Sequence, residues 1–196
     1  MIESADVFRA FQPYRGDAIV SVTGTAGRNW QNFSQNEKRD VSFGGAMGHT
    51  IDATFGMALG LPDEKVVLFD AEGALLMNLG VLATIAGKKP KNFYHFLLDN
   101  ECYATTGGQP VPNAEQIDYA GMAEAAGYAS VHRFDDLEEF VTNVESILDE
   151  TGPVFVSIKV VPEVENLPIG LRTRIPTRSR AETIKDLQKE LGIAVG

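Results

Sequence analysis

Two apolar runs of the sequence each end on side chains that could hold a ligand. The first run, 66–69, leads to Glu72 and Gly73, and the second, 93–98, leads to Asn100. If the two runs are adjacent parallel strands, these residues meet at the carboxyl edge of a sheet, where α/β proteins bind ligands. A carboxylate, an amide oxygen and a loop carbonyl form the hard oxygen set that Mg²⁺ prefers. Either half alone is more typical of a helix cap or a turn, and only together do the two halves favour a metal site.

Two glycine-rich segments upstream could approach the same ligand. The segment 21–30 follows the first apolar strand pattern, and its small residues, among them Gly24 and Thr25, could present backbone N–H groups to a phosphate. It lacks the third glycine and the helix pattern of a dinucleotide fingerprint, so an ordinary loop and a ligand loop both stay open. The segment 42–60 carries glycines before a helix pattern, which lets backbone approach a ligand closely.

Apolar runs alternate with helix-like segments along the chain, and these elements must position the polar residues. The expected strands are 18–22, 66–69, 93–98, 129–134 and 154–160, and the expected helices are 48–61, 74–87, 117–127, 136–150 and 180–191. The strand runs are almost continuously hydrophobic, as in strands that are buried on both faces. The alternation therefore predicts an α/β fold, with a doubly wound, mostly parallel sheet and helices on both of its faces.

Composition narrows the classes of protein and partner. The chain has 196 residues, of which 44 % are hydrophobic, and this is enough for the core of one domain. Its net charge of −10 would repel a phosphate backbone, so we expect no nucleic-acid partner. No apolar run reaches about 18 residues, and no basic-then-apolar leader follows Met1. We therefore expect no membrane partner and a cytoplasmic location.

Four further features receive ordinary interpretations. Cys102 is the single cysteine, so it forms no internal disulfide, and we interpret it as a loop thiol. The basic segment 171–180 is interpreted as a solvated extended stretch before the last helix, with a subunit contact as the alternative. His95 and His132 lie inside strand patterns, and we interpret them as core or surface histidines.

The polar segments taken together resemble the signature of thiamine diphosphate-dependent enzymes. That signature is normally Gly-Asp-Gly followed at some distance by Asn-Asn, and this chain has VVLFDAEGALLMN followed by FLLDNECY. The segments GGAMG, LLMNLGVLATIAGKKPKN and TTGGQP are most similar to the small subunits of sulfopyruvate decarboxylase and the matching part of phosphonopyruvate decarboxylase. The resemblance extends from about Asp17 to Pro168. It implies the thiamine diphosphate-binding fold, with 1–196 as a single diphosphate-binding domain and a C-terminal extension from about 168.

The resemblance assigns the first set of residues to the metal and the diphosphate. It implies that Mg²⁺ is bound by Glu72, by Asn100 and by the backbone carbonyl of Cys102. It also implies that Gly73 and Ala74 contact the diphosphate.

The GGAMG segment receives a role in holding the thiamine itself. The resemblance implies that the carbonyl of Gly45 accepts a hydrogen bond from the aminopyrimidine. It also makes Met47, which alone would be interpreted as core packing, the bulky residue that holds thiamine bent, with its 4′-amino group over the thiazolium C2. His49 would face the substrate as a proton donor or carboxylate contact, with a backbone-bonded histidine at a helix start as the alternative. The remaining expected cofactor contacts are Gly24, Thr25, Ala46, Asn100 and Tyr103.

Two departures from the signature bear on metal binding. Ala71 and Glu72 stand in place of Gly-Asp, and Asp99 replaces the first Asn. Glutamate is longer than aspartate by one methylene, about 1.5 Å, and Mg²⁺ tolerates misplaced ligands poorly. The charge and the ligand type are kept, so we expect a working site. Asp99 occupies a position that need not coordinate the metal.

The family's activity implies a partner that this chain does not contain. Thiamine diphosphate serves as an electron sink while a 2-oxo acid loses CO₂ and yields an aldehyde. The cofactor also requires a glutamate from a pyrimidine-binding domain, for which the chain leaves no room before its first strand. We therefore expect a lyase that is active only with an α-type subunit carrying that domain and its glutamate, and that acts on a small 2-oxo acid. The alternatives are an acetolactate synthase-like carboligase subunit and a non-catalytic cofactor-binding or scaffold subunit.

Overall fold

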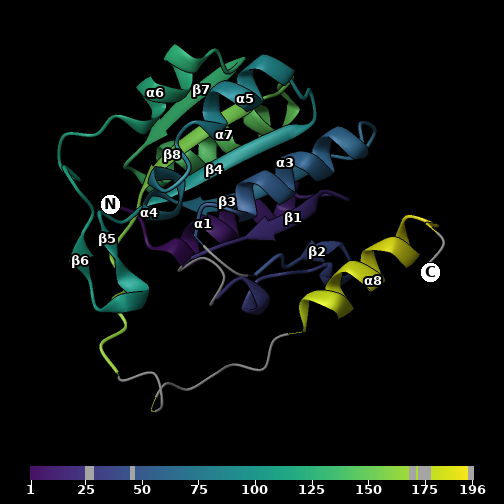
Figure 1. The fold of residues 1–196 in the computed structure, drawn as a ribbon, viewed down its shortest axis with the longest axis horizontal. Helices are drawn as coiled ribbons and strands as arrows, with labels where there is room; N and C mark the ends of the chain where they lie inside the picture. The colour runs from purple at the N-terminus through teal and green to yellow at the C-terminus, as the bar shows by residue number, and fades with distance from the viewer. Residues whose placement is uncertain (25–28, 45–46, 168–170, 172–177, 194–196) are drawn as a thin grey trace.

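The computed structural model describes residues 1–24, 29–44, 47–167, 171 and 178–193. Six parallel strands of these residues form one sheet, in the order β2-β1-β3-β4-β8-β7 (Figure 1). Their bounds are β1 Ile19–Val22, β2 Asp40–Val41, β3 Val66–Ala71, β4 Phe93–Asp99, β7 Ser130–Phe134 and β8 Val154–Lys159. All the predicted strands are confirmed, and so is the parallel α/β sheet.

Helices cover both faces of the sheet, as predicted. They are α1 Ser4–Phe11, α3 Thr50–Gly60, α4 Glu72–Leu76, α5 Val81–Lys88, α6 Tyr119–Ala126, α7 Leu137–Asp149 and α8 Arg180–Glu190. One core lies under α1 and α7 and includes Phe69, and the other lies under α3, α5 and α6 and includes Leu68. Successive residues of a buried strand therefore belong to opposite cores, which explains the continuous apolar runs. Among the described residues, no helix is long and apolar enough to cross a membrane.

The elements differ from the sequence prediction in three places. The predicted helix 74–87 is divided into α4 and α5 by a turn. This turn lets the side-chain amide of Asn78 donate to the carbonyl of Gly48 at 3.0 Å and to Asp52 at 2.9 Å, so it links the helix pair to the glycine segment. Two elements, α1 and β2, are absent from the prediction. A separate two-stranded antiparallel sheet, β5 Cys102–Tyr103 with β6 Gln109–Pro110, follows β4.

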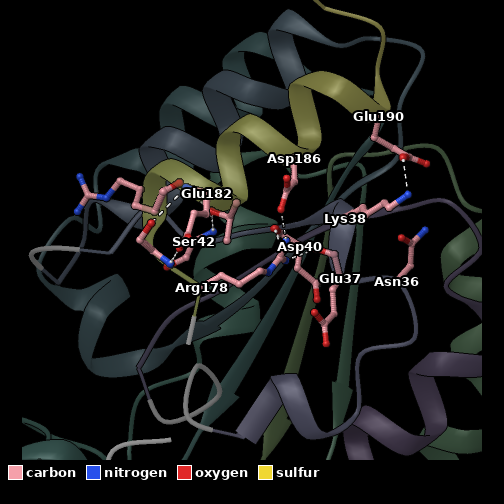
Figure 2. A network of polar contacts seen from close by, with 12 residues as sticks. Asn36, Glu37, Lys38, Asp40, Ser42, Arg178, Glu182, Asp186 and Glu190 are labelled. Carbon is pink, nitrogen blue, oxygen red and sulfur yellow. Dashed lines mark hydrogen bonds and ion pairs between the residues drawn. The ribbon is translucent and has the colours of Figure 1, made fainter. Parts of the chain in front are cut away.

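The C-terminal helix α8 packs against the edge strand β2 (Figure 2). The backbone N–H of Ser42 donates to Oγ1 of Thr183 at 3.2 Å. Arg178 lies 3.0 Å from Asp186 and donates to the backbone carbonyls of Glu37 and Asp40. The described end of the basic segment therefore bonds within its own chain.

The order of the strands creates a crevice between β1 and β3. The chain leaves β1 for β2 on one side and later enters β3 on the other. The connection after β1 contributes Trp30 to the core under α1, whereas the connection after β3 contributes Leu75 to the core under α3. Connections that leave neighbouring strands toward opposite faces open a crevice at the carboxyl ends of those strands. The segments that the sequence marks for chemistry follow these two strand ends.

Candidate functional site

Two glycines at the crevice leave no room for a Cβ atom of their own, because neighbouring side chains lie against their backbone. Gly24 follows β1 with a φ of +62°, and a Cβ placed on it would lie 2.9 Å from Cβ of Ala71. A Cβ on Gly73 would lie 2.7 Å from the ring of Tyr103. Both positions therefore require glycine. These contacts bring the ends of β1 and β3 and the segment after β4 to one point.

A small pocket of about 30 Å³ lies at this point. It is lined by Gly24, Met47, Ala71, Gly73, Asn100, Cys102, Tyr103, Ala104 and Thr105. The structure thus brings together six of the predicted cofactor and metal residues from segments far apart in the sequence. Met47 is 38 % exposed, so it is not a core methionine, and its Cε lies 3.5 Å from the Cβ position of Gly73.

Glu72 lies between two pocket residues, Ala71 and Gly73, and its side chain is buried beside the pocket without lining it. Oε2 accepts a hydrogen bond from the backbone N–H of Asn100 at 3.3 Å. Oε1 is buried and has no hydrogen-bond partner in the described part of the chain. Burial, followed by the charge of Asp99, raises the pKa of Glu72 to about 7, although nearby backbone N–H groups oppose the shift. A buried carboxylate oxygen without a donor is costly in a folded protein, so this atom points to a cationic ligand.

The turn after β4 holds Asn100 beside Glu72. The Oδ1 atom of Asn100 accepts a hydrogen bond from the backbone N–H of Cys102 at 3.1 Å, which is the geometry of an Asx turn. Glu101 lies between them with a φ of +62°, in the left-handed region that few residues other than glycine adopt. Local strain of this kind is tolerated where the surrounding structure fixes it, and it is common at binding sites.

A charged group that the sequence pattern does not predict lies next to the site. Nζ of Lys159 lies 2.8 Å from Asp99 and 2.6 Å from Glu101. This contact follows from the register of β4 with β8, which pairs Asp99 with Lys159. Burial raises the pKa of Asp99, while the hydrogen bond and charge of Lys159 oppose the shift. Asp99 therefore has a lysine as its partner, and the expectation that it need not bind metal stays a prediction. A lysine at the end of an apolar run was the one sequence signal for this contact.

The other predicted site residues lie in different surroundings. Ala74 is buried, and its carbonyl oxygen is 3.3 Å from the Cβ position of Gly48. His49 is exposed at the start of α3, where Nδ1 lies 3.5 Å from Asp52, and it does not line the small pocket. Its role toward the substrate stays a prediction. Thr25, Gly45 and Ala46 lie outside the residues that the structure describes.

The interpretation of the remaining histidines is confirmed. His95 is buried and lies 3.1 Å from Asp70, and His132 is half-buried and lies 3.0 Å from Glu150. Cys102 is a half-buried free thiol, and burial raises its pKa.

The oxygen atoms of the site fit a divalent cation that also binds phosphate. Within the described ranges, no group of three or more His, Cys, Asp or Glu side chains is arranged to hold a metal. The predicted set does not need such a group, because it combines the carboxylate of Glu72 with an amide oxygen and a backbone carbonyl. Mg²⁺ commonly binds through few carboxylates and completes its shell with phosphate and water. The unpartnered Oε1 of Glu72 is the observation that fits such an ion.

Comparison with known families and structures agrees with this geometry. Residues 20–158 match the family described as thiamine pyrophosphate enzyme, C-terminal TPP binding domain. The structure of benzoylformate decarboxylase from Polynucleobacter necessarius has a TM-score of 0.68 with this chain at 17 % identity, over 84 % of this chain and 33 % of that one. At this identity the structural likeness concerns the fold alone, and it confirms the predicted fold.

Two relatives are similar in sequence over most of the chain. The β subunit of sulfopyruvate decarboxylase from Methanothermobacter thermautotrophicus is 40 % identical over 125 residues, which are 64 % of this chain and 64 % of that protein. Phosphonopyruvate decarboxylase from Streptomyces hygroscopicus is 34 % identical over 145 residues, which are 74 % of this chain and 35 % of that protein. The chain thus spans less than two thirds of the length of either relative. The resemblance drawn from the motifs is confirmed.

Proposed function

Because the chain belongs to the thiamine pyrophosphate enzymes, through their C-terminal TPP-binding domain, we propose that it is the β-type subunit of a 2-oxo acid decarboxylase. The enzyme depends on thiamine diphosphate and Mg²⁺, takes a small sulfopyruvate- or phosphonopyruvate-like substrate, and releases an aldehyde and CO₂. Residues 1–196 serve as its diphosphate-binding domain. The observation that carries the proposal is the buried, unpartnered Oε1 of Glu72 next to Asn100.

The residues at and beside the pocket have distinct parts in this proposal. Glu72, Asn100 and the carbonyl of Cys102 hold Mg²⁺, and the backbone at Gly73 lies against the diphosphate without a side chain in between. Bound there, thiamine diphosphate supplies the electron sink that allows a 2-oxo acid to lose CO₂. The cation also compensates for the burial of Glu72, because a carboxylate with a raised pKa gains most from a positive neighbour.

Met47 supports the thiamine ring in this arrangement. Its side chain is apolar and 38 % exposed, and it lines the pocket. An exposed methionine next to a glycine offers a surface on which a heterocycle can rest. Met77 is 59 % exposed, and its Cβ lies 3.3 Å from the Cβ position of Gly48, the residue that follows Met47.

A separate α-type subunit completes the site. The pocket of about 30 Å³ is far smaller than the several hundred Å³ that enclose a cofactor-sized ligand. A second surface is therefore needed to cover the thiamine, and in this proposal it belongs to the pyrimidine-binding domain with its catalytic glutamate. The name of the relative from Methanothermobacter thermautotrophicus, a β subunit, supports a hetero-oligomer.

The first test is to isolate the chain from its native cells under mild conditions and to identify by mass spectrometry what accompanies it, and in what ratio. We expect a stoichiometric partner with a pyrimidine-binding domain. A homo-oligomer without such a partner would contradict the proposal, because the glutamate would have no source. Assays of the purified pair with sulfopyruvate and phosphonopyruvate, with and without an acceptor aldehyde, then separate decarboxylation from carboligation.

One observation favours a second candidate, a scaffold subunit that does not catalyse. Glu72 is longer than the aspartate of the family signature and is buried with one oxygen unpartnered. The variant Glu72→Asp decides between the two functions when it is assembled with the partner. If the natural pair is inactive and this variant is active, the natural chain is a scaffold. If the natural pair is active and the variant is not better, the longer acid is the working ligand.

A further inference from the structure

Two ionisable side chains that the proposed function does not use lie in the core beneath the site. His95 and Asp70 are both at most 1 % exposed, and Nε2 of His95 lies 3.1 Å from Oδ2 of Asp70. Apolar side chains of similar volume often stabilise a core as well as a buried polar pair does. A role beyond packing is therefore worth seeking for this pair.

The pair belongs to a chain of polar contacts that ends at the backbone next to Glu72. On one side, Nδ1 of His95 lies 3.5 Å from the hydroxyl of Tyr128. On the other side, Oδ1 of Asp70 accepts a hydrogen bond from the backbone N–H of Ala71 at 2.9 Å. Ala71 is the last residue of β3, and Glu72 begins α4 immediately after it. The contacts therefore extend from the core to the peptide that precedes Glu72.

The register of the sheet fixes the pair in one arrangement. β3 and β4 place Leu68 opposite His95 and Asp70 opposite Leu97, so the histidine reaches the aspartate diagonally on one face of the sheet. The imidazole also meets the ring of Phe155 edge-on, with 4.7 Å between the ring centroids. A ring held on two sides leaves the carboxylate of Asp70 a single orientation.

We propose that Asp70, held by His95, is a positioning residue for Glu72. Through the N–H of Ala71, it fixes the direction in which the backbone leaves β3, and thereby the place of the Glu72 carboxylate. The inference rests on the proposed function, because it assumes that this carboxylate binds Mg²⁺. A longer acid amplifies any rotation of its backbone, and Mg²⁺ tolerates little displacement of a ligand. Groups that orient metal ligands matter for affinity nearly as much as the ligands themselves.

Three variants separate positioning from packing. The double variant Asp70→Leu/His95→Phe removes the contact to Ala71 and both polar groups together, so no lone charge stays buried. The single variant Asp70→Asn keeps the shape and the acceptor oxygen for Ala71. The control is His132→Gln, which disrupts another His–carboxylate pair, 3.0 Å long, in β7 at the far edge of the sheet.

The first measurement is amide hydrogen exchange of the full chain without cofactor. The N–H of Asn100 donates to Oε2 of Glu72, so its protection reports the position of that carboxylate. In the double variant we expect exchange at Asn100 and Ala71 to accelerate about tenfold relative to mid-strand amides such as that of Phe96. Asp70→Asn and the control should leave this ratio nearly unchanged. A uniform acceleration, or no change at Asn100, would mean that the pair only packs the core and would overturn the proposal.

The second measurement is the affinity of the chain, assembled with its partner, for thiamine diphosphate in the presence of Mg²⁺. The double variant should bind about 10–100-fold more weakly, and Asp70→Asn and the control should bind as the natural chain does. Equal affinity in all variants would overturn the inference. If the natural assembly does not bind thiamine diphosphate, the proposed function fails, and the exchange ratio at Asn100 still decides whether the pair positions Glu72.

Discussion

At the β2 edge, polar side chains are paired and partly exposed, whereas at the end of β3 an acid is buried with one oxygen unpaired. Arg178 lies near Asp186 and donates to two backbone carbonyls, and Ser179 and Glu182 form a capping box for α8 (Figure 2). Oε2 of Glu72 accepts a hydrogen bond from the backbone N–H of Asn100, Oε1 has no partner in the described part of the chain, and the pKa of the side chain is raised to about 7. The side chains that connect α8 to β2 are therefore paired, whereas one oxygen of the buried acid is open.

The difference is the physical basis for our proposal that the end of β3 binds a ligand. Exposed ion pairs such as Lys38 with Glu190 stabilise a fold only slightly. A buried acid without full compensation lowers stability, and real proteins keep such features where function requires them. The buried acid therefore lowers the stability of the chain without cofactor, whereas the paired side chains at the α8 edge raise it. Four experiments test this contrast.

The largest effect is expected for Glu72→Gln. The amide keeps the shape but loses the negative charge, so Mg²⁺-dependent binding of thiamine diphosphate by the assembled enzyme should weaken about 100-fold or more. The free energy of unfolding of the chain without cofactor should rise by about 1–2 kcal/mol at pH 8, because no buried charge is left. Titration calorimetry and urea unfolding measure the two effects. A variant that loses both affinity and stability would contradict the view that the buried acid lowers stability and is kept for binding.

A second test adds one methyl group at the point of closest approach. In Gly73→Ala the new Cβ would lie 2.7 Å from the ring of Tyr103, so the variant should lose about 1–3 kcal/mol of unfolding free energy. The matched control is Gly87→Ala in α5, where nothing lies within 4 Å of the new Cβ. The control should gain up to about 1 kcal/mol, since alanine favours a helix. Equal stability of both variants in urea unfolding would refute the close packing at the site.

The pH dependence of the chain without cofactor should show the cost of the buried acid. The folded pKa of Glu72, about 7, lies above its ordinary value of 4.5, so the folded chain binds more protons than the unfolded chain between these values. The unfolding free energy should therefore fall by about 2–3 kcal/mol as pH rises from 5 to about 8 and then level off. Burial raises the pKa of Asp99 in the same direction. Glu72→Gln should remove most of this pH dependence. If the variant keeps the full pH dependence, other groups cause it.

Local pattern was enough to predict the strands, and the family resemblance supplied the candidate site residues. The runs that became β3 and β4 are apolar along their whole length because helices cover both faces, and this signal is present in the sequence itself. Gly24 was marked by the small residues that follow a strand pattern, and Gly73 by its place at a strand end and in the family signature. In contrast, β2 is two residues long, and it is a strand only because it pairs with β1. The turn that divides α4 from α5 depends on the contact of Asn78 with Gly48.

The missed contacts depend on register between segments that are distant in sequence. Lys159 meets Asp99 only because β8 pairs with β4, and His95 meets Asp70 only because β4 pairs with β3. Periodicity assigns a residue to a strand and a face, but it does not say which residue lies opposite. The helix α1 had a local signal in Val7, Phe8 and Phe11, which are buried on one side of a single short helix. The charged groups near Glu72 could be identified only from the register of the folded sheet.

The smallest effects are expected at the α8 edge, where they complete the contrast with the site. Arg178→Gln removes the 3.0 Å contact with Asp186 and the donors to two backbone carbonyls, so the unfolding free energy should fall by about 1–1.5 kcal/mol. Lys38→Gln breaks an exposed pair with 3.8 Å between Nζ and Glu190, and the change should stay below about 0.5 kcal/mol. Affinity for thiamine diphosphate in the assembled enzyme should stay constant in both variants, since neither residue lines the pocket. A loss of affinity in Arg178→Gln that Lys38→Gln does not share would show that the edge and the site are coupled. The contact for this coupling is Ser42, which donates its N–H to Thr183 at the start of the glycine segment 42–60.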